Sequence, residues 1–165
     1  MEKDEVATIA QALHDRLLEA KLSLVTAESC TGGLVAAAIT EIPRASVTLE
    51  LGYVTYSNAA KESDLGVPAA TLDKYGAVSE QTARAMAQGA LAHSKADLAV
   101  AVTGIAGPDG GSAEKPVGLV HFAAARRGGT TLHREIRFGD LGRTEVRRRS
   151  VLAAFALLNE LLDAR

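Results

Sequence analysis

A serine in a sharp turn and a lysine in a later helix are the residues of this chain best suited to chemistry. Ser29 lies between a run typical of a buried strand, at about 22–27, and the apolar start of a helix, Leu34 to Ile39. A hydroxyl at such a junction sits beside unpaired backbone N–H groups and the positive end of a helix dipole. These surroundings can stabilise the oxyanion formed when the hydroxyl attacks a carbonyl. Lys61, which follows a second predicted strand, could supply the base, and this pairing indicates a hydrolase.

Each of these residues also has a simpler interpretation. Ser29 could be an ordinary helix N-cap, although Thr31 could supply that cap instead. Lys61 taken alone would be a solvated helix lysine, because an amine acts as a base only when burial lowers its pKa. Beside Ser29 it becomes a partner that Tyr56 could orient. Cys30 is intrinsically more nucleophilic than serine, but a lone cysteine in this position is expected to be a small buried group.

A glycine-rich loop and a group of arginines are candidates for binding an anion. The loop Thr103 to Pro116 follows an apolar strand, the usual place for a ligand in an open α/β sheet, and lacks the endings of nucleotide-binding glycine loops. It could form an anion-binding concavity or a flexible connector. Arg143 and Arg147 share a helical face that suits a phosphate, although a solvated face is the favoured interpretation, and Arg44 is a lesser candidate.

Composition excludes several other classes of protein. The 165 residues are 47% apolar with a net charge of −2, so no basic excess is available for nucleic acid. A charged N-terminus, the absence of an apolar stretch long enough for a bilayer, and the single cysteine predict a cytoplasmic protein without membrane contact. The four histidines are scattered without metal-ligand spacing, and His121 is expected to be packed or on the surface. We therefore expect no metal and no other cofactor.

Alternating helical and strand patterns predict the elements that position these residues. Helices are expected over 3–20, after Leu34, through Lys61 to Leu65, from Ser79 to about Ser94, and from Arg143 onward. Strands are expected at about 22–27, 47–57, 98–102, 117–125 and 130–138, with a hairpin turn at Gly128–Gly129. The pattern predicts a single domain over residues 1–165. Its fold would be a three-layer α/β/α sandwich, with a mixed sheet that is parallel at its centre and ends in an antiparallel hairpin.

Four segments resemble the family of the CinA C-terminal domain. They are Ala27–Gly33, Gly52–Lys61, Gly76–Ser79 and Thr103–Gly111, and they occur in the family's order over nearly the whole chain. The stand-alone members of this family are nicotinamide-nucleotide amidohydrolases. The N-terminal domain of longer CinA proteins is not matched, and 165 residues would leave no room for it.

The resemblance implies hydrolysis of the carboxamide of nicotinamide mononucleotide, giving nicotinate mononucleotide and ammonia in pyridine-nucleotide recycling. It implies that Ser29 is the nucleophile and Lys61 the base, with Tyr56 assisting. The residues expected to bind the substrate are Cys30, Thr31, Gly32, Gly33, Asn58, Thr103, Gly104, Ala106, Gly107 and Arg143. The alternative is a regulatory module that binds a nucleotide or phosphate without catalysis. Because the chain is rich in alanine and poor in aromatic residues, it is also expected to form a homo-oligomer.

Overall fold

The computed structural model describes residues 2–164, with side chains from residue 5 onward, and has one five-stranded sheet in the order β2-β1-β3-β4-β5. The strands are β1 (Leu24–Glu28), β2 (Leu49–Val54), β3 (Leu98–Gly104), β4 (Leu119–Arg126) and β5 (Thr131–Arg137). β1 runs parallel to β2 and β3, whereas β3, β4 and β5 pair antiparallel. The predicted mixed sheet with an antiparallel hairpin is confirmed.

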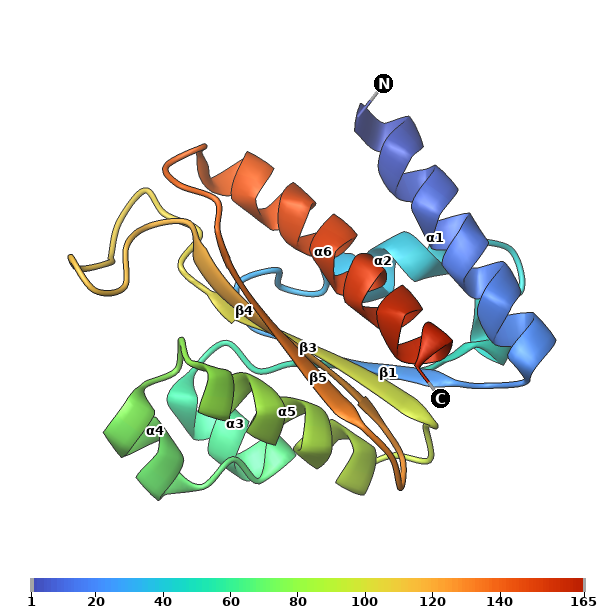
Figure 1. The fold of residues 1–165 in the computed structure, drawn as a ribbon, viewed down its shortest axis with the longest axis horizontal. Coiled ribbons are helices and arrows are strands. Elements are labelled where there is room, and N and C mark those ends of the chain that lie inside the picture. The colour runs from blue at the N-terminus through green and yellow to red at the C-terminus, as the bar shows by residue number, and fades with distance from the viewer. Residues whose placement is uncertain (1, 165) are drawn as a thin grey trace.

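Helices cover both faces of this sheet, as predicted (Figure 1). One layer contains α1 (Glu2–Ala20), α2 (Leu34–Thr40) and α6 (Arg143–Asp163), and the other contains α3 (Asn58–Leu65), α4 (Ala69–Tyr75) and α5 (Glu80–Ala92). Residues of β3 alternate between the two cores: Leu98, Val100 and Val102 join the first, and Ala99 and Ala101 the second. No helix within residues 2–164 is long and apolar enough to cross a membrane.

The structure corrects the boundaries of the elements around the candidate site. β1 begins and ends slightly later than predicted, so Glu28 belongs to the strand. The strand expected over 47–57 is shorter in the structure, where β2 covers Leu49–Val54. A 3₁₀ turn at Ala45–Val47 precedes it, and α3 follows it. Ser57 ends the extended segment because its hydroxyl accepts a hydrogen bond from the backbone N–H of Ala60 and caps α3. Lys61 therefore lies in the first turn of this helix.

Two further differences come from proline and glycine. Helix α4 was not predicted, and Pro68 directly precedes its first turn. Strand β4 begins at Leu119, two residues later than expected. Gly118 has φ +90, and a Cβ there would lie 2.1 Å from the carbonyl oxygen of Gly139. The strand starts later because the N–H of Leu119 donates to the carbonyl of Pro116 and closes a turn there.

Gly89 allows α5 to approach α3, the helix that carries Lys61. A Cβ at this position would lie 1.9 Å from the carbonyl oxygen of Leu65. Alanine normally stabilises a helix interior relative to glycine, by about 1 kcal/mol. Here we expect Gly89→Ala to lower the free energy of unfolding in urea by about 1–3 kcal/mol, because the two helices must move apart.

Gly129→Ala is the matched control for this prediction. A Cβ at Gly129 would lie 3.5 Å from Cβ of Arg126, which is an ordinary contact. Its unfolding free energy should stay within about 0.5 kcal/mol of the wild-type value. A Gly89→Ala variant as stable as the wild type would contradict the close packing of the two helices.

Candidate active site

The side chains of Ser29 and Lys61 are in contact at the carboxyl ends of the parallel strands β1 and β2. Lys61 Nζ lies 2.9 Å from Ser29 Oγ. It also lies 2.8 Å from the carbonyl oxygen of Thr55 and 3.2 Å from that of Tyr56. Ser29 follows β1, Thr55 and Tyr56 follow β2, and Lys61 comes from α3, so the ends of two neighbouring parallel strands and the helix after the second build this cluster. The predicted proximity of hydroxyl and amine is present in the structure.

The surroundings of Lys61 favour a neutral amine. The side chain is 1% exposed, and no acidic group among the described residues forms an ion pair with it. Burial lowers the pKa of Lys61, because the charged form loses its hydration. A thiolate at Cys30 would oppose this shift, but burial raises the pKa of that thiol to about 11 and keeps it protonated near neutral pH.

The three oxygen atoms around Nζ can also accommodate a neutral amine that acts as a base. A neutral amine has two N–H groups and one lone pair, and the carbonyls of Thr55 and Tyr56 can take both N–H groups. The lone pair is then left for the third neighbour, the hydroxyl of Ser29. The two carbonyls therefore orient the amine toward the hydroxyl. The contribution of Thr55 was not predicted, since a backbone carbonyl leaves no signal in the residue type.

The phenol of Tyr56 does not orient the lysine. Its hydroxyl accepts a hydrogen bond from Arg143 at 2.7 Å, and the side chain is 57% exposed. Only the carbonyl oxygen of Tyr56 contacts Lys61. Tyr56 therefore contacts the amine through its backbone carbonyl, while its ring extends toward α6.

Glu28 caps the helix that follows the nucleophile turn, a role that the sequence analysis missed. Its carboxylate accepts hydrogen bonds from the backbone N–H groups of Val35 at 2.8 Å and Ala36 at 3.1 Å. The N-cap residue of α2 is Gly33, which has φ 104, and the expected Thr31 cap is absent. The expected positive helix end is thus offset by a buried carboxylate. An acidic residue just before a turn and a helix was the available signal.

The remaining free N–H groups lie in the turn itself. Gly32 N–H donates to the carbonyl of Ser29, and Leu34 N–H donates to that of Thr31. Within residues 2–164, the backbone N–H groups of Cys30, Thr31 and Gly33 have no hydrogen-bond partner in another residue. Unpartnered donors beside a serine hydroxyl are what an oxyanion site requires. Among the described residues near Ser29, the unpartnered N–H groups therefore lie in the turn that precedes α2.

Cys30 points into the core formed by α1, α2 and α6. Its side chain is 4% exposed, as the sequence analysis expected for a small buried group. The raised pKa of its thiol leaves almost no thiolate near neutral pH. Cys30 is therefore poorly suited to act as the nucleophile.

The residues expected around the substrate have different surroundings. Asn58 is exposed at the start of α3. Thr103 is buried, and its hydroxyl donates to the carbonyl of Ala77 at 2.8 Å. Ala106 lies in the core, and a Cβ at Gly104 would lie 2.7 Å from Val120 Cγ2. Ala106 and Gly104 thus have packing roles, and only their backbone atoms remain for a ligand.

Two arginines of α6 join this helix to the loops of the site. Arg143 donates to the carbonyl of Gly107 at 2.9 Å, in addition to the Tyr56 hydroxyl. Arg147 donates to the carbonyls of Cys30 and Thr31. The favoured interpretation of a solvated face is therefore wrong for Arg147, which is half-buried with its fork engaged. Arg143 is exposed and remains accessible beside the glycine-rich loop.

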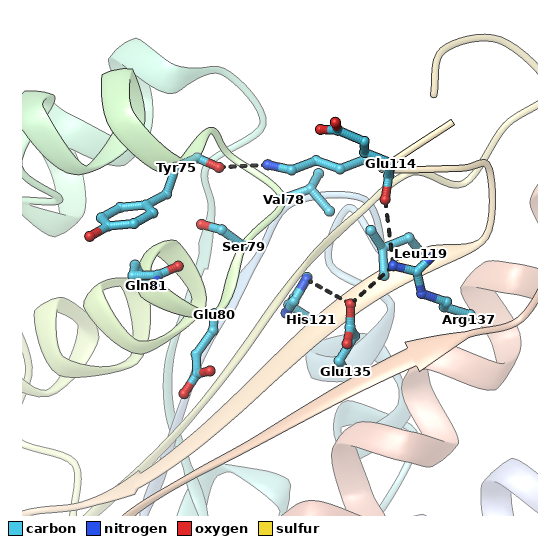
Figure 2. A pocket seen from close by; sticks show the side chains of 11 residues that line it. Tyr75, Val78, Ser79, Glu80, Gln81, Glu114, Leu119, His121, Glu135 and Arg137 are labelled. Carbon is cyan, nitrogen blue, oxygen red and sulfur yellow. Dashed lines mark hydrogen bonds and ion pairs between the residues drawn. The ribbon is translucent and has the colours of Figure 1, made fainter. Parts of the chain in front are cut away.

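A separate pocket of about 350 Å³ lies between the start of α5 and strands β4 and β5 (Figure 2). Ser29 and Lys61 do not line it. The strands bring His121 and His133 together with 2.9 Å between Nδ1 and Nε2, although the sequence showed no spacing that relates them. His121 is packed, at 8% exposure, and faces Glu135 as Figure 2 shows. Burial lowers the pKa of both histidines, which favours their neutral forms.

Among the described residues no group of three or more histidine, cysteine or acidic side chains could hold a metal.

Comparison with known proteins identifies the family of this chain. Residues 6–162 match the CinA C-terminal domain. The nicotinamide-nucleotide amidohydrolase PncC of Pseudomonas putida is 48% identical over 158 residues, which cover 96% of this chain and 98% of that relative. A CinA-like protein of Akkermansia muciniphila is 55% identical over 125 residues, which cover 76% of this chain. The chain spans only 28–37% of the length of the Akkermansia relative and of three other curated relatives.

A solved structure shows the same fold over nearly the whole chain. The competence/damage inducible protein CihA of Agrobacterium tumefaciens superposes with a TM-score of 0.93 at 52% identity, covering 96% of each chain. The competence damage-inducible protein A of Klebsiella pneumoniae superposes with a TM-score of 0.91 at 37% identity. From the domain match, these relatives and this fold, the chain belongs to the family of the CinA C-terminal domain.

Proposed function

We propose that this protein hydrolyses the carboxamide of nicotinamide mononucleotide to nicotinate mononucleotide and ammonia, in pyridine-nucleotide recycling. The observation that carries the proposal is the 2.9 Å contact between Ser29 Oγ and the buried amine of Lys61. The name of the Pseudomonas putida relative, which is matched along almost all of its length, supplies the substrate.

The proposed reaction begins with a proton transfer from Ser29 to Lys61. The hydroxyl donates to neutral Nζ, and its oxygen attacks the carboxamide carbon as the proton moves. The carbonyl oxygen of the substrate becomes an oxyanion, for which the unpartnered N–H groups of Thr31 and Gly33 are the proposed donors. Burial supports this step, since a charged lysine could not accept the proton.

The protonated lysine then completes the reaction. Lys61 returns its proton to the leaving nitrogen, so that ammonia departs and an acyl-enzyme remains on Ser29. A water molecule, deprotonated by the neutral amine, attacks the acyl carbon and releases nicotinate mononucleotide. One water is consumed for each ammonia released, and both side chains return to their starting states.

The phosphate of the substrate needs a cationic partner, and we propose Arg143 together with the loop from Gly104 to Gly111. Arg143 is exposed and lies against the carbonyl of Gly107, so its guanidinium stands at the edge of this loop. The Tyr56 hydroxyl holds the guanidinium from the other side. In this arrangement Tyr56 assists by positioning the cation.

The purified protein, incubated with nicotinamide mononucleotide in a coupled ammonia assay, tests the proposed function. We expect stoichiometric ammonia and nicotinate mononucleotide. A regulatory module would bind the nucleotide and release no ammonia, and that result would overturn the proposal. A module of that kind needs no buried amine directed at a serine hydroxyl, so the geometry favours the enzyme.

We also propose that the chain self-associates through β2. This strand is at the edge of the sheet, and it exposes Leu51 at 38% and Val54 at 52%. An apolar edge strand offers unpaired backbone groups to the same strand of a second copy. Light scattering should show an oligomer for the wild type and a smaller species for Leu51→Lys. A wild-type protein that is monomeric at high concentration would contradict this.

We further propose that the sequence forms one domain and acts in the cytoplasm. A single sheet carries both hydrophobic cores, which supports one domain. The lone cysteine is buried and cannot form an intrachain disulfide, so the fold does not depend on an oxidising compartment.

A further inference from the structure

Arg147 holds the back of the turn that contains the nucleophile. Its Nε lies 3.1 Å from the carbonyl oxygen of Cys30, and one terminal nitrogen lies 3.2 Å from that of Thr31. Within residues 5–164 no acidic side chain forms an ion pair with this guanidinium. Both of its described contacts are therefore to backbone carbonyls of one turn. A planar fork can bind two adjacent carbonyls in a fixed orientation, which a lysine cannot do.

The geometry of the peptide unit transmits this contact to the other side of the turn. In a trans peptide the carbonyl and the following N–H point in opposite directions. Arg147 binds the carbonyl of Cys30, so the N–H of Thr31 must point away from α6. Among the described residues, this N–H is one of the unpartnered donors of the turn that contains Ser29. The arginine thus fixes the direction of a proposed oxyanion donor without touching the substrate.

We infer that Arg147 is a positioning residue for the reaction, which holds and polarises the Cys30–Thr31 peptide so that its N–H can bind the oxyanion. A cation at the carbonyl end of a peptide withdraws charge and strengthens the N–H at the other end. The inference rests on the proposed amidohydrolase function and adds a residue that the catalytic pair does not include.

Packing around the turn supports the same role. A Cβ on Gly32, which has φ +59, would lie 3.4 Å from a terminal nitrogen of Arg147, so the turn follows the guanidinium closely. Arg143, one helical turn earlier, binds the Gly107 carbonyl and the Tyr56 hydroxyl. Helix α6 therefore connects the three loops that surround the catalytic pair, and Arg147 is its contact with the nucleophile turn.

Arg147→Met tests this inference, because methionine keeps the unbranched stem and removes the fork. We expect kcat for nicotinamide mononucleotide to fall by roughly tenfold to a hundredfold. This fall should not exceed the one caused by removing an oxyanion donor directly. KM should change little, because the ground-state amide makes weaker use of the donor. The kcat of Arg147→Lys should lie between those of Arg147→Met and the wild type, since lysine restores the charge without the two-point contact.

A transition-state mimic separates positioning from a merely structural role. The aldehyde analogue of nicotinamide mononucleotide adds to a serine hydroxyl and places an oxyanion in the turn. Its affinity should fall in proportion to kcat in Arg147→Met, while affinity for nicotinate mononucleotide stays unchanged. Arg149→Met is the matched control on the same helix, because Arg149 pairs with Glu145 at the surface, and it should behave as the wild type.

Each result bears on the inference. A folded Arg147→Met variant with unchanged kcat would overturn it, and so would equal losses of affinity for the aldehyde and the product. If this variant fails to fold, the same measurements on Arg147→Lys decide, with a loss of kcat and aldehyde affinity together as the expected outcome. Wild-type protein that releases no ammonia would instead overturn the proposed function, and this inference with it.

Discussion

Ser29→Ala is expected to abolish the release of ammonia from nicotinamide mononucleotide, by at least about 10⁴-fold. Among the residues with described side chains, the alanine removes the one hydroxyl that contacts the buried amine of Lys61. A remaining oxyanion site can polarise the carboxamide, but no acyl-enzyme can form. Product should be followed by coupled ammonia release at substrate concentrations well above KM, so that a change in binding does not hide residual turnover.

The fold should survive this substitution, which makes the result interpretable. Ser29 is 8% exposed, and its side chain has one described partner, Lys61. The amine keeps the carbonyls of Thr55 and Tyr56 when the hydroxyl is lost. Circular dichroism and the unfolding midpoint should therefore remain close to those of the wild type.

Ser63→Ala is a suitable control, because Ser63 lies on the exposed side of α3 and bonds only to Asp64. It should retain full turnover. If Ser29→Ala also retained full turnover, the nucleophile would have to be Cys30 or a bound water. The raised pKa of the Cys30 thiol argues against the first of these.

The sequence predicted the elements of the site better than their contacts. The buried strand before Ser29 and the helix after it follow from apolar patterning, which is a local property. The approach of Lys61 was predicted from the need of Ser29 for a base and from the place of Lys61 after a second strand. The predicted end of the second strand at residue 57 was wrong, because the capping signal at Ser57 overlaps a run of β-prone residues.

The unpredicted features all involve backbone atoms or distant side chains. Every residue has a backbone carbonyl, so the residue type of Thr55 does not predict its contact with Lys61. Arg147 bonds to carbonyls more than a hundred positions away. Glu28 was visible in the sequence but was assigned no role, because Thr31 was the more familiar cap. Such contacts depend on three-dimensional placement, which periodicity does not give.

Lys61→Met is the second decisive substitution, with an expected loss of at least about a hundredfold in kcat/KM. Methionine has a similar length and fills a site that is 1% exposed without adding charge. Without the amine no group among the described contacts of Ser29 can accept its proton. The variant should remain folded, because the only lost partners are two carbonyls and the serine hydroxyl.

The pH dependence of the wild type identifies the amine as the base. Only the neutral amine accepts a proton, so kcat/KM should rise with pH through the pKa of Lys61. Because burial lowers this pKa, the midpoint of that rise should lie below 10.5, the ordinary value for lysine. Lys61→Met should lack this limb in its residual activity. A wild-type midpoint at the value for free lysine would contradict a buried, neutral base.

The free energy of unfolding should also depend on the protonation of Lys61. Between the folded pKa of Lys61 and its unfolded value, the unfolded chain binds more protons than the folded one. The free energy of unfolding therefore receives a contribution that rises with pH across this window, and below it the buried amine carries the full cost of being charged. Lys61→Met removes this contribution, so the difference in stability between the two proteins should be most favourable to the variant at low pH. Urea titrations at several pH values on both proteins measure this difference directly. If the difference did not vary with pH, the pKa of Lys61 would be the same in both states, and the amine would have no lowered pKa with which to activate Ser29.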